Sequence, residues 1–424
     1  MDLSIKNLSQ TIGKRPGLTS FCAALGLLSG SAHAEWLLLP TASIESQHSS
    51  NFQLFSGENQ QRDSLFSHSV LAGVDISNQT ERTTINGRAE LSYSSYTNDR
   101  LLEDTDRQYF ELELRRRYDR GALGLSLSVR RDDLLRFVGS LSDPDDALND
   151  GGDDLELGLT DPNIDLNFET TQIGRTTSIV KTLSQYRLTE RNSLRFNYTF
   201  VNRDVDSTDE QDLIGVLPNG NTRHTVDLSF QRSLSRRSRL RWNNRVSLND
   251  TGTLDDVYIF ESSLGWSSSL GEQTNITTNV GVTRTSGAPE NRTGLVTRAS
   301  LQHTVSWGSI SAGVSRSFRP TLRGNVTETD TLQLSFQTQL SPSLSLNFDA
   351  SGNRRQRSAD TDIEDNNEFF RLGPRLTYAL TPKWAVSAGY EFRRVKRDRE
   401  FASGSANDHA GILSVLYTPA GIRL

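Results

Sequence analysis

The chain has 424 residues, a formal net charge of −6 and a mean hydropathy of −0.52, with 34% hydrophobic residues. No apolar run approaches the roughly 20 residues of a membrane-spanning helix, so the sequence excludes a helical membrane protein. A transmembrane barrel remains open, because a barrel strand crosses the bilayer with about 9–11 residues, of which every second one is apolar. The acidic balance argues against nucleic acid as a partner.

The N-terminus predicts a cleaved secretory signal peptide over residues 1–34. Basic residues precede an apolar stretch at 18–28, and the small residues Ala32 and Ala34 fit cleavage between Ala34 and Glu35. The alternative, a membrane anchor, needs a longer apolar run than this one. Cys22, the sole cysteine, lies inside the peptide. We therefore expect residues 35–424 to form a single transmembrane domain without disulfides or thiol chemistry.

Apolar and polar residues alternate with period two in many segments between residues 36 and 417. Two such segments, 332–340 and 344–350, are separated by Ser341-Pro342, which predicts a hairpin with one apolar face. Nearly every segment has this pattern and nothing reads as a covering helix, so we expect an all-β, antiparallel, up-and-down barrel with its apolar side in lipid. Eighteen strands are predicted, or 16 if the first and sixth are absent: 36–45, 67–77, 82–96, 107–118, 122–132, 173–187, 193–205, 222–235, 239–250, 255–269, 274–285, 293–307, 309–318, 326–340, 343–354, 365–379, 383–397 and 409–417.

Two kinds of connection alternate along the chain. Short ones, such as Asp119-Arg120-Gly121, are followed by long, charged ones, such as 133–171. This predicts periplasmic turns and both termini at one rim, with extracellular loops at the other. Aromatic residues beside the short turns predict a girdle at the lipid headgroups, with ordinary β-propensity as the alternative: Tyr118, Tyr186, Trp266, Trp307, Tyr378 and Trp384.

A recurrent hairpin and the first residues after the predicted cleavage point carry a resemblance to a known class. Glu35-Trp36 opens the mature chain, and the hairpin Leu188-Thr189-Glu190-Arg191-Asn192-Ser193-Leu194 has counterparts around Pro342 and Pro382. In these features the chain resembles Gram-negative outer-membrane barrels, and more narrowly the proteobacterial barrels that accompany exopolysaccharide and exosortase-type loci. The resemblance implies a porin-like protein in the outer membrane, in contact with lipid and lipopolysaccharide and folded by the barrel-assembly machinery. It also implies a link to export or uptake of surface polysaccharide, and it brings no catalytic motif.

The C-terminal end departs from such barrels, which commonly finish on an aromatic residue. The last alternating run ends at Tyr417, and a further segment reaches Leu424. Either Tyr417 is the terminal aromatic residue with a short tail after it, or Leu424 takes its place.

Charged residues occupy many of the polar positions, mostly odd-numbered, that alternate with the apolar ones, and they are expected to face the lumen. In a pore they would set ion selectivity, whereas in a sealed barrel they would fill the interior as ion pairs. Arginine outnumbers acid in this set, which favours anionic solutes or sugar acids. The candidate lining residues are Arg115, Arg117, Arg195, Arg241, Arg245, Arg298, Arg371, Arg375 and Arg393, with Glu111, Glu113, Asp227, Glu261, Asp349 and Glu391.

The segment 143–169 is strongly acidic and contains neither Lys nor Arg. Its oxygen ligands suit Ca²⁺, although their spacing is not that of an EF-hand loop. The alternatives are a solvated extracellular loop, or a constriction folded into the lumen against the arginines. The candidate Ca²⁺ ligands are Asp143, Asp145, Asp146, Asp150, Asp153 and Asp154.

An enzyme is not expected, because the histidines outside the signal peptide belong to no nucleophile motif and are far apart in sequence: His48, His68, His224, His303 and His409. Our first hypothesis is a passive or partly plugged outer-membrane channel for hydrophilic solutes. The second is a non-conducting structural or adhesion barrel whose outer loops bind partners. The third is a soluble β-solenoid or sandwich.

Overall fold

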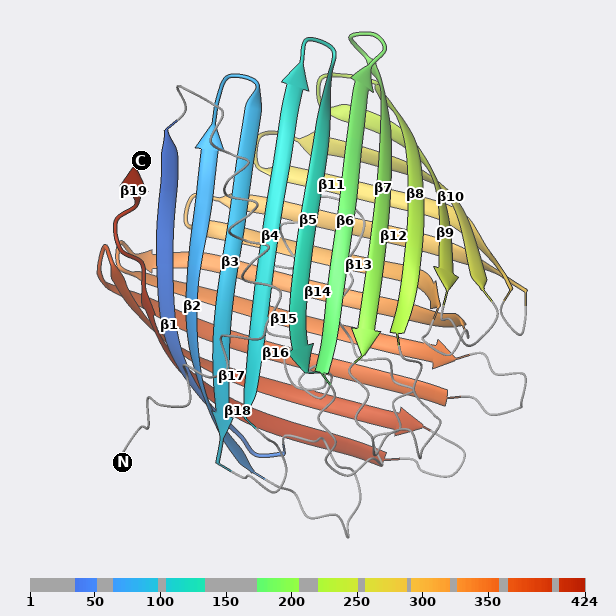
Figure 1. Ribbon diagram of the computed structural model, residues 1–424. Coiled ribbons are helices and arrows are strands. Elements are labelled where there is room, and N and C mark those ends of the chain that lie inside the picture. Colours follow the sequence, from blue (N-terminus) through green and yellow to red (C-terminus); the bar gives the residue numbers. More distant parts are fainter. Residues whose placement is uncertain are drawn as a thin grey trace.

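A computed structural model describes residues 35–51, 64–97, 104–133, 174–205, 220–250, 256–287, 291–320, 326–357, 365–398 and 404–423. They form one antiparallel sheet that closes into a barrel of 18 strands (Figure 1). No helix among these residues is long and apolar enough to cross a membrane. The strands are β1 (Trp36–Ser49), β2 (Leu65–Gln79), β3 (Thr83–Tyr96), β4 (Thr105–Tyr118), β5 (Gly121–Asp133), β6 (Gly174–Arg187), β7 (Asn192–Val205), β8 (Gly220–Ser233), β9 (Ser238–Asp250), β10 (Val257–Leu270), β11 (Thr274–Ser286), β12 (Arg292–Val305), β13 (Gly308–Pro320), β14 (Val326–Ser341), β15 (Leu344–Arg357), β16 (Asp365–Thr381), β17 (Trp384–Asp398), β18 (Gly404–Tyr417) and the short β19 (Ile422–Arg423).

The first and last long strands close the sheet. Strand β1 pairs with β2 on one side and with β18 on the other, so the barrel wall has no free edge. The count of 18 is confirmed, and both segments that were weakest in the sequence form strands, β1 and β6. Several strands extend past the predicted limits, because the hydrogen-bonded ladder continues into the rims after the apolar alternation has faded.

The C-terminal segment pairs with the part of β1 that β18 leaves unpaired. Tyr417 lies opposite Ala42, and after a break Ile422 lies opposite Leu38, so β19 extends the wall beyond the end of β18. The ring of Tyr417 also packs on Trp384, with 4.5 Å between centroids. Strand β18 ends at Tyr417, whereas Leu424 lies outside the described residues, so both alternatives stay predictions.

The two faces of the sheet differ in character. Large apolar side chains such as Leu264 (54% exposed) and Val280 (55% exposed) lie on one face. Arg393 (1% exposed) and Asp408 (0% exposed) lie on the other. Because no described element packs on the outer face of this single-layer barrel, the buried polar residues must be on the inner face, and the apolar face is the outer one. This arrangement is stable only with lipid around the barrel, as the sequence predicted.

Short turns join the strands at one rim. In the recurrent hairpin, a hydroxyl at the first turn position accepts hydrogen bonds from two backbone N–H groups: Thr189 Oγ1 from Arg191 and Asn192 at 3.3 and 3.1 Å, and Thr381 Oγ1 from Lys383 and Trp384 at 3.2 and 3.1 Å. The motif is therefore a local turn device. All six predicted girdle residues are exposed on strands or turns at this rim.

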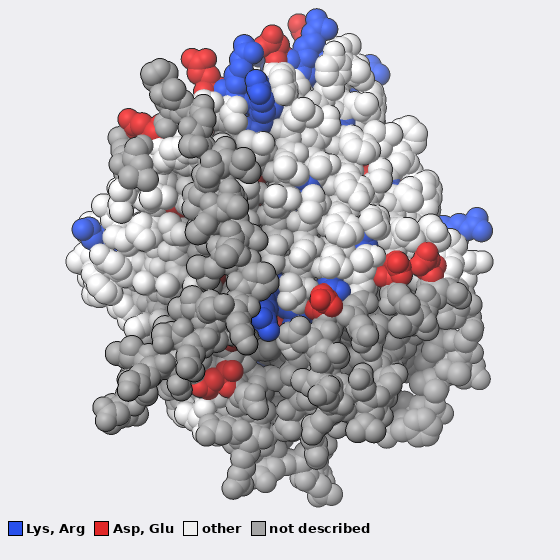
Figure 2. Space-filling model, in the orientation of Figure 1, with Lys and Arg blue, Asp and Glu red and all other residues white. Residues whose placement is uncertain are grey.

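Charged side chains, like the aromatic residues, gather at the short-turn rim of the barrel (Figure 2). Figure 2 shows the wall built from the first strands, with Lys, Arg, Asp and Glu side chains gathered at the short-turn rim and a band below it that is mostly uncharged. An uncharged band between two polar rims is the pattern of a transmembrane barrel.

Candidate functional site: the inner face of the barrel

The predicted lining residues all lie on inner-face positions. Their backbone register pairs them with polar residues of neighbouring strands, as where Glu261 faces Arg245 and where Arg371 faces Arg393. Arg298 is on this face although its number is even, because the connection before β12 changes the parity of the apolar positions. Whether these residues line a conducting passage remains a proposal, developed below.

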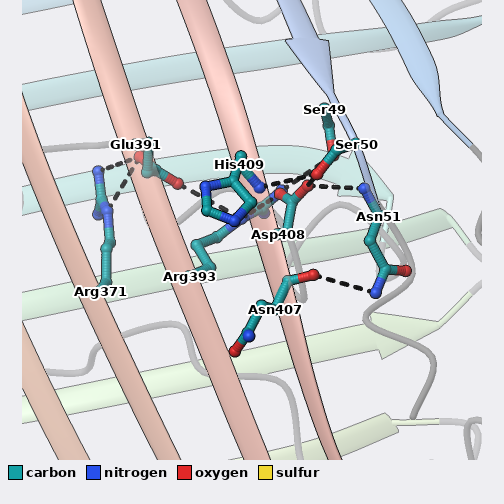
Figure 3. Close-up of polar contacts among 9 residues, drawn as sticks. All are labelled: Ser49, Ser50, Asn51, Arg371, Glu391, Arg393, Asn407, Asp408 and His409. Carbon is teal, nitrogen blue, oxygen red and sulfur yellow. Dashed lines mark hydrogen bonds and ion pairs between the residues drawn. The ribbon is translucent and has the colours of Figure 1, made fainter.

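The most enclosed polar cluster lies where the barrel closes, between β17, β18 and the end of β1 (Figure 3). Asp408 accepts hydrogen bonds from Ser49 Oγ at 2.8 Å, the Asn51 backbone N–H at 2.8 Å and Arg393 Nε at 2.9 Å. Ser50 Oγ adds a fourth contact to the same carboxylate at 3.2 Å. Because four donors bind one buried carboxylate, this cluster holds β1 and β18 together at the seam, the place where the first and last long strands close the barrel. We call it the structural lock.

A second ion pair lies beside this lock. Arg371 on β16 donates to Glu391 on β17 through Nε at 3.0 Å, with Nη2 at 2.9 Å from the same oxygen. Glu391 is also 3.6 Å from Arg393. Arg375 reaches Glu45 on β1 at 4.0 Å, which spans the inner face past β17 and β18. The predicted alternative of structural ion pairing therefore applies to this wall, where acid and arginine are matched.

The wall formed by β6 to β9 has a different balance. Its described inner face contains a single carboxylate, Asp227, which Arg245 contacts through Nε at 2.6 Å. Cations are spread over all four strands: Arg175, Lys181, Arg187, Arg195, Arg203, Arg223, Arg239, Arg241 and Arg245. We call these residues the basic wall. The sequence predicted Arg195, Arg241 and Arg245 within it; the others could have been found from the same alternation.

The long-loop end of one hairpin turns toward the inside. Pairing of β12 with β13 ends at Thr297 and Arg316, whereas β13 and β14 stay paired as far as Pro320. Past that point Phe318 packs against Val257 and Ile259, two buried residues of the inner face. The β13–β14 hairpin therefore parts from β12 at this end, and Phe318 turns toward the inner face of the barrel.

The five histidines of the described residues lie on the outer face of the barrel. His68, His224, His303 and His409 make hydrogen bonds at 2.6 to 2.9 Å with the hydroxyls of Ser46, Tyr198, Thr274 and Tyr390 respectively. His48 packs on Phe66 with 4.3 Å between centroids. These contacts give the rings hydroxyl and aromatic partners at the membrane-facing surface, away from the inner polar clusters.

Two further predictions fall wholly or partly outside the described residues. Asp143 to Asp154, the candidate Ca²⁺ ligands, lie outside the described residues, and within the described ranges no group of three His, Asp or Glu residues is placed to hold a metal ion. Glu35 is the first described residue and its carbonyl accepts from Asn78 Nδ2 at 3.3 Å. Cleavage between Ala34 and Glu35 stays a prediction.

No protein-family model and no curated protein sequence matches the chain. Among solved structures, the chain is similar to the FrpB iron transporter of Neisseria meningitidis, with 10% identity and a TM-score of 0.47 over 93% of this chain and 83% of that one. It is similar to OccK7 (OpdD) of Pseudomonas aeruginosa, with 9% identity and a TM-score of 0.46 over 93% and 100%. The outer membrane protein opdK of the same organism gives 10% and 0.44 over 91% and 98%. At these values the likeness assigns neither a substrate nor an activity.

Proposed function

We propose that this protein is an outer-membrane channel through which small hydrophilic anions diffuse. The observation that carries the proposal is the basic wall: nine cations and one carboxylate share the described inner face of β6 to β9. The chain as a whole is acidic, with a formal charge of −6. Positive charge is thus concentrated on the inner face of β6 to β9 while the overall balance of the chain is negative.

The physical basis of the preference is electrostatic. A surface lined by one sign of charge raises the local concentration of the opposite ion, and low-dielectric walls strengthen this effect. Guanidinium groups add directional hydrogen bonds to carboxylates and phosphates. Passage then needs no covalent step: an anion exchanges part of its hydration shell for arginine contacts and moves from one to the next.

The excess of arginine and the sequence resemblance each add a finer expectation. Solutes such as sugar acids fit the basic wall, because they combine a carboxylate with many hydroxyls. The link to export or uptake of surface polysaccharide, by contrast, has no support beyond the hairpins and the start of the mature chain, and it remains a prediction.

Planar-bilayer recording of the purified, folded protein tests the proposal. We expect discrete conductance steps and a reversal potential, in a salt gradient, that shows anion preference. Replacing Arg195, Arg203 and Arg241 together with Gln should move the reversal potential toward zero. Arg131→Gln is the matched control, because Arg131 lies on the outer face of β5.

Three outcomes separate the hypotheses. Anion preference that falls in the triple variant and not in the control supports the channel. Cation preference in the parent protein contradicts it. A correctly folded protein that never conducts would support the second hypothesis, a structural or adhesion barrel whose loops bind partners.

A further inference from the structure

A row of alternating charges crosses the outer face of five neighbouring strands. The backbone register places Arg316 on β13 opposite Asp330 on β14, and Asp330 opposite Arg354 on β15. Arg354 lies opposite Glu368 on β16, which lies opposite Lys396 on β17. These five residues share the face that carries the apolar residues of the same strands. We call them the outer charged row.

The middle of the row lies at a defined height on the barrel. On β15, ten positions separate Arg354 from Leu344 at the short-turn end of the strand. At ~3.3 Å per residue and a strand tilt of ~40°, this distance corresponds to a rise of ~25 Å. That is about the height of the apolar band of an outer-membrane barrel. Arg354, in the middle of the row, therefore lies where the hydrocarbon of the outer leaflet meets its headgroups, and Arg394, ten positions from Trp384 on β17, lies at the same height.

The surface at the row is hollow. A cavity of about 1050 Å³ is lined by all five residues of the row and by Arg394, and below them by apolar residues that include Leu332, Phe370 and Phe392. It lies beside the point where β13 separates from β12 and turns inward to Phe318. Gly352 adds room at its centre, because a Cβ there would meet nothing closer than 3.8 Å.

Cations exceed acids in this cavity. Arg316 is held by Asp330 at 2.6 Å and by Glu328 at 3.1 Å. Arg354, Arg394 and Lys396 are exposed, and Glu368 is the one carboxylate of the row that lies between Arg354 and Lys396. The cavity thus offers three exposed cations above an apolar floor.

We infer that this cavity binds an anionic lipid of the outer leaflet, namely the phosphorylated lipid A portion of lipopolysaccharide. Its phosphates contact Arg354, Arg394 and Lys396, and its acyl chains cover Phe370, Phe392 and Leu332. Charge complementarity at headgroup height, directly above an apolar hollow, carries the inference. It depends on the barrel lying in the membrane and is independent of whether the lumen conducts.

Native mass spectrometry of the delipidated protein in detergent, titrated with purified lipid A, tests the site. We expect one lipid A adduct per chain whose affinity falls about tenfold or more in the triple variant Arg354→Gln, Arg394→Gln and Lys396→Gln, because the variant removes three charge-assisted contacts to phosphate. Arg131→Gln, on the outer face of the opposite wall, should bind like the parent. Heat-modifiable gel migration establishes that each variant is folded.

Two further measurements make the inference specific. Gly352→Trp keeps every charge and fills the hollow, so it should weaken lipid A binding while a surface that acts by charge alone would be unaffected. Lipid A without its phosphates should bind at least about tenfold more weakly than the phosphorylated form. Equal binding of both forms, equal binding of phosphatidylglycerol, or full binding by the folded triple variant would overturn the assignment.

Discussion

Arg393 and Asp408 form a buried ion pair between the last two long strands of the barrel. Arg393 donates through Nε to Asp408 at 2.9 Å, and both residues are almost fully enclosed. The same carboxylate accepts from Ser49 and Asn51 at the end of β1. One aspartate therefore joins the first strand of the chain to the last at the long-loop rim.

Removing this aspartate should destabilise the barrel strongly. Asp408→Ala removes the nearest carboxylate of a buried guanidinium and leaves it Glu391 at 3.6 Å, and breaking such a buried pair costs about 3–5 kcal/mol. We expect a large fall in the denaturant midpoint, followed by tryptophan fluorescence in detergent. The double variant Asp408→Ala with Arg393→Met should recover much of the loss, because it removes the uncompensated charge. A single variant as stable as the parent would show that the seam does not depend on the pair.

The orientation of the sheet can be tested on one strand with neighbouring residues. Leu334 is exposed on the outer face of β14, and Gln333 is on the inner face. Leu334→Arg should destabilise the barrel in lipid vesicles by about 2–4 kcal/mol, whereas the charge at position 333 should be tolerated in the aqueous interior. Unfolding titrations of Leu334→Arg and Gln333→Arg measure the difference. The opposite order would reverse the assignment of the two faces.

The inward turn of the β13–β14 hairpin depends on a glycine. A Cβ on Gly294 would lie 2.1 Å from the Phe318 ring, so Gly294→Ala forces Phe318 out of its place. We expect a loss of about 1–3 kcal/mol, the usual cost of overpacking. In the Phe318→Ala background the same change should cost little. Gly313→Ala is the control, because a Cβ there meets only a carbonyl oxygen at 3.8 Å.

The turn hydroxyl of the recurrent hairpin should contribute to the stability of the barrel. Thr381→Ala removes the acceptor of two backbone N–H groups, those of Lys383 and Trp384. The expected loss is about 1 kcal/mol, because the turn is exposed and water replaces part of the bonding. Thr381→Ser keeps the acceptor and should retain parent stability. If Thr381→Ser were as unstable as Thr381→Ala in urea titrations, the methyl group and not the hydroxyl would be responsible.

The strands and their faces were predictable because a barrel strand carries its own signal. Alternation in β7 and β8 assigns Phe196 and Leu228 to one face and Arg195 and Asp227 to the other, with no knowledge of the neighbours. The same signal contained most of the basic wall. Arg203 and Arg223 were overlooked although they alternate with Asn202 and His224, so the information was present in the sequence.

The seam cluster could not be found in this way. Ser49 and Asp408 are 359 residues apart, and they meet only because the barrel closes. The row from Arg316 to Lys396 has the same origin, since its alternation of charge runs across strands and appears only once every register is fixed. Phe318 is a third case: its position in the sequence assigns it to the outer face, and the parting of β12 from β13 turns it inward.

The amino-acid sequence by itself determined that this chain is a membrane barrel with an apolar outer face and a charged inner face, because side chains two residues apart on a strand always share a face. Only the closed structure decided which charges meet across strands, where the wall departs from a regular cylinder, and hence where an anion or a lipid can bind. Those features depend on the register between strands and on the closure of the ring, and neither is written in any single segment.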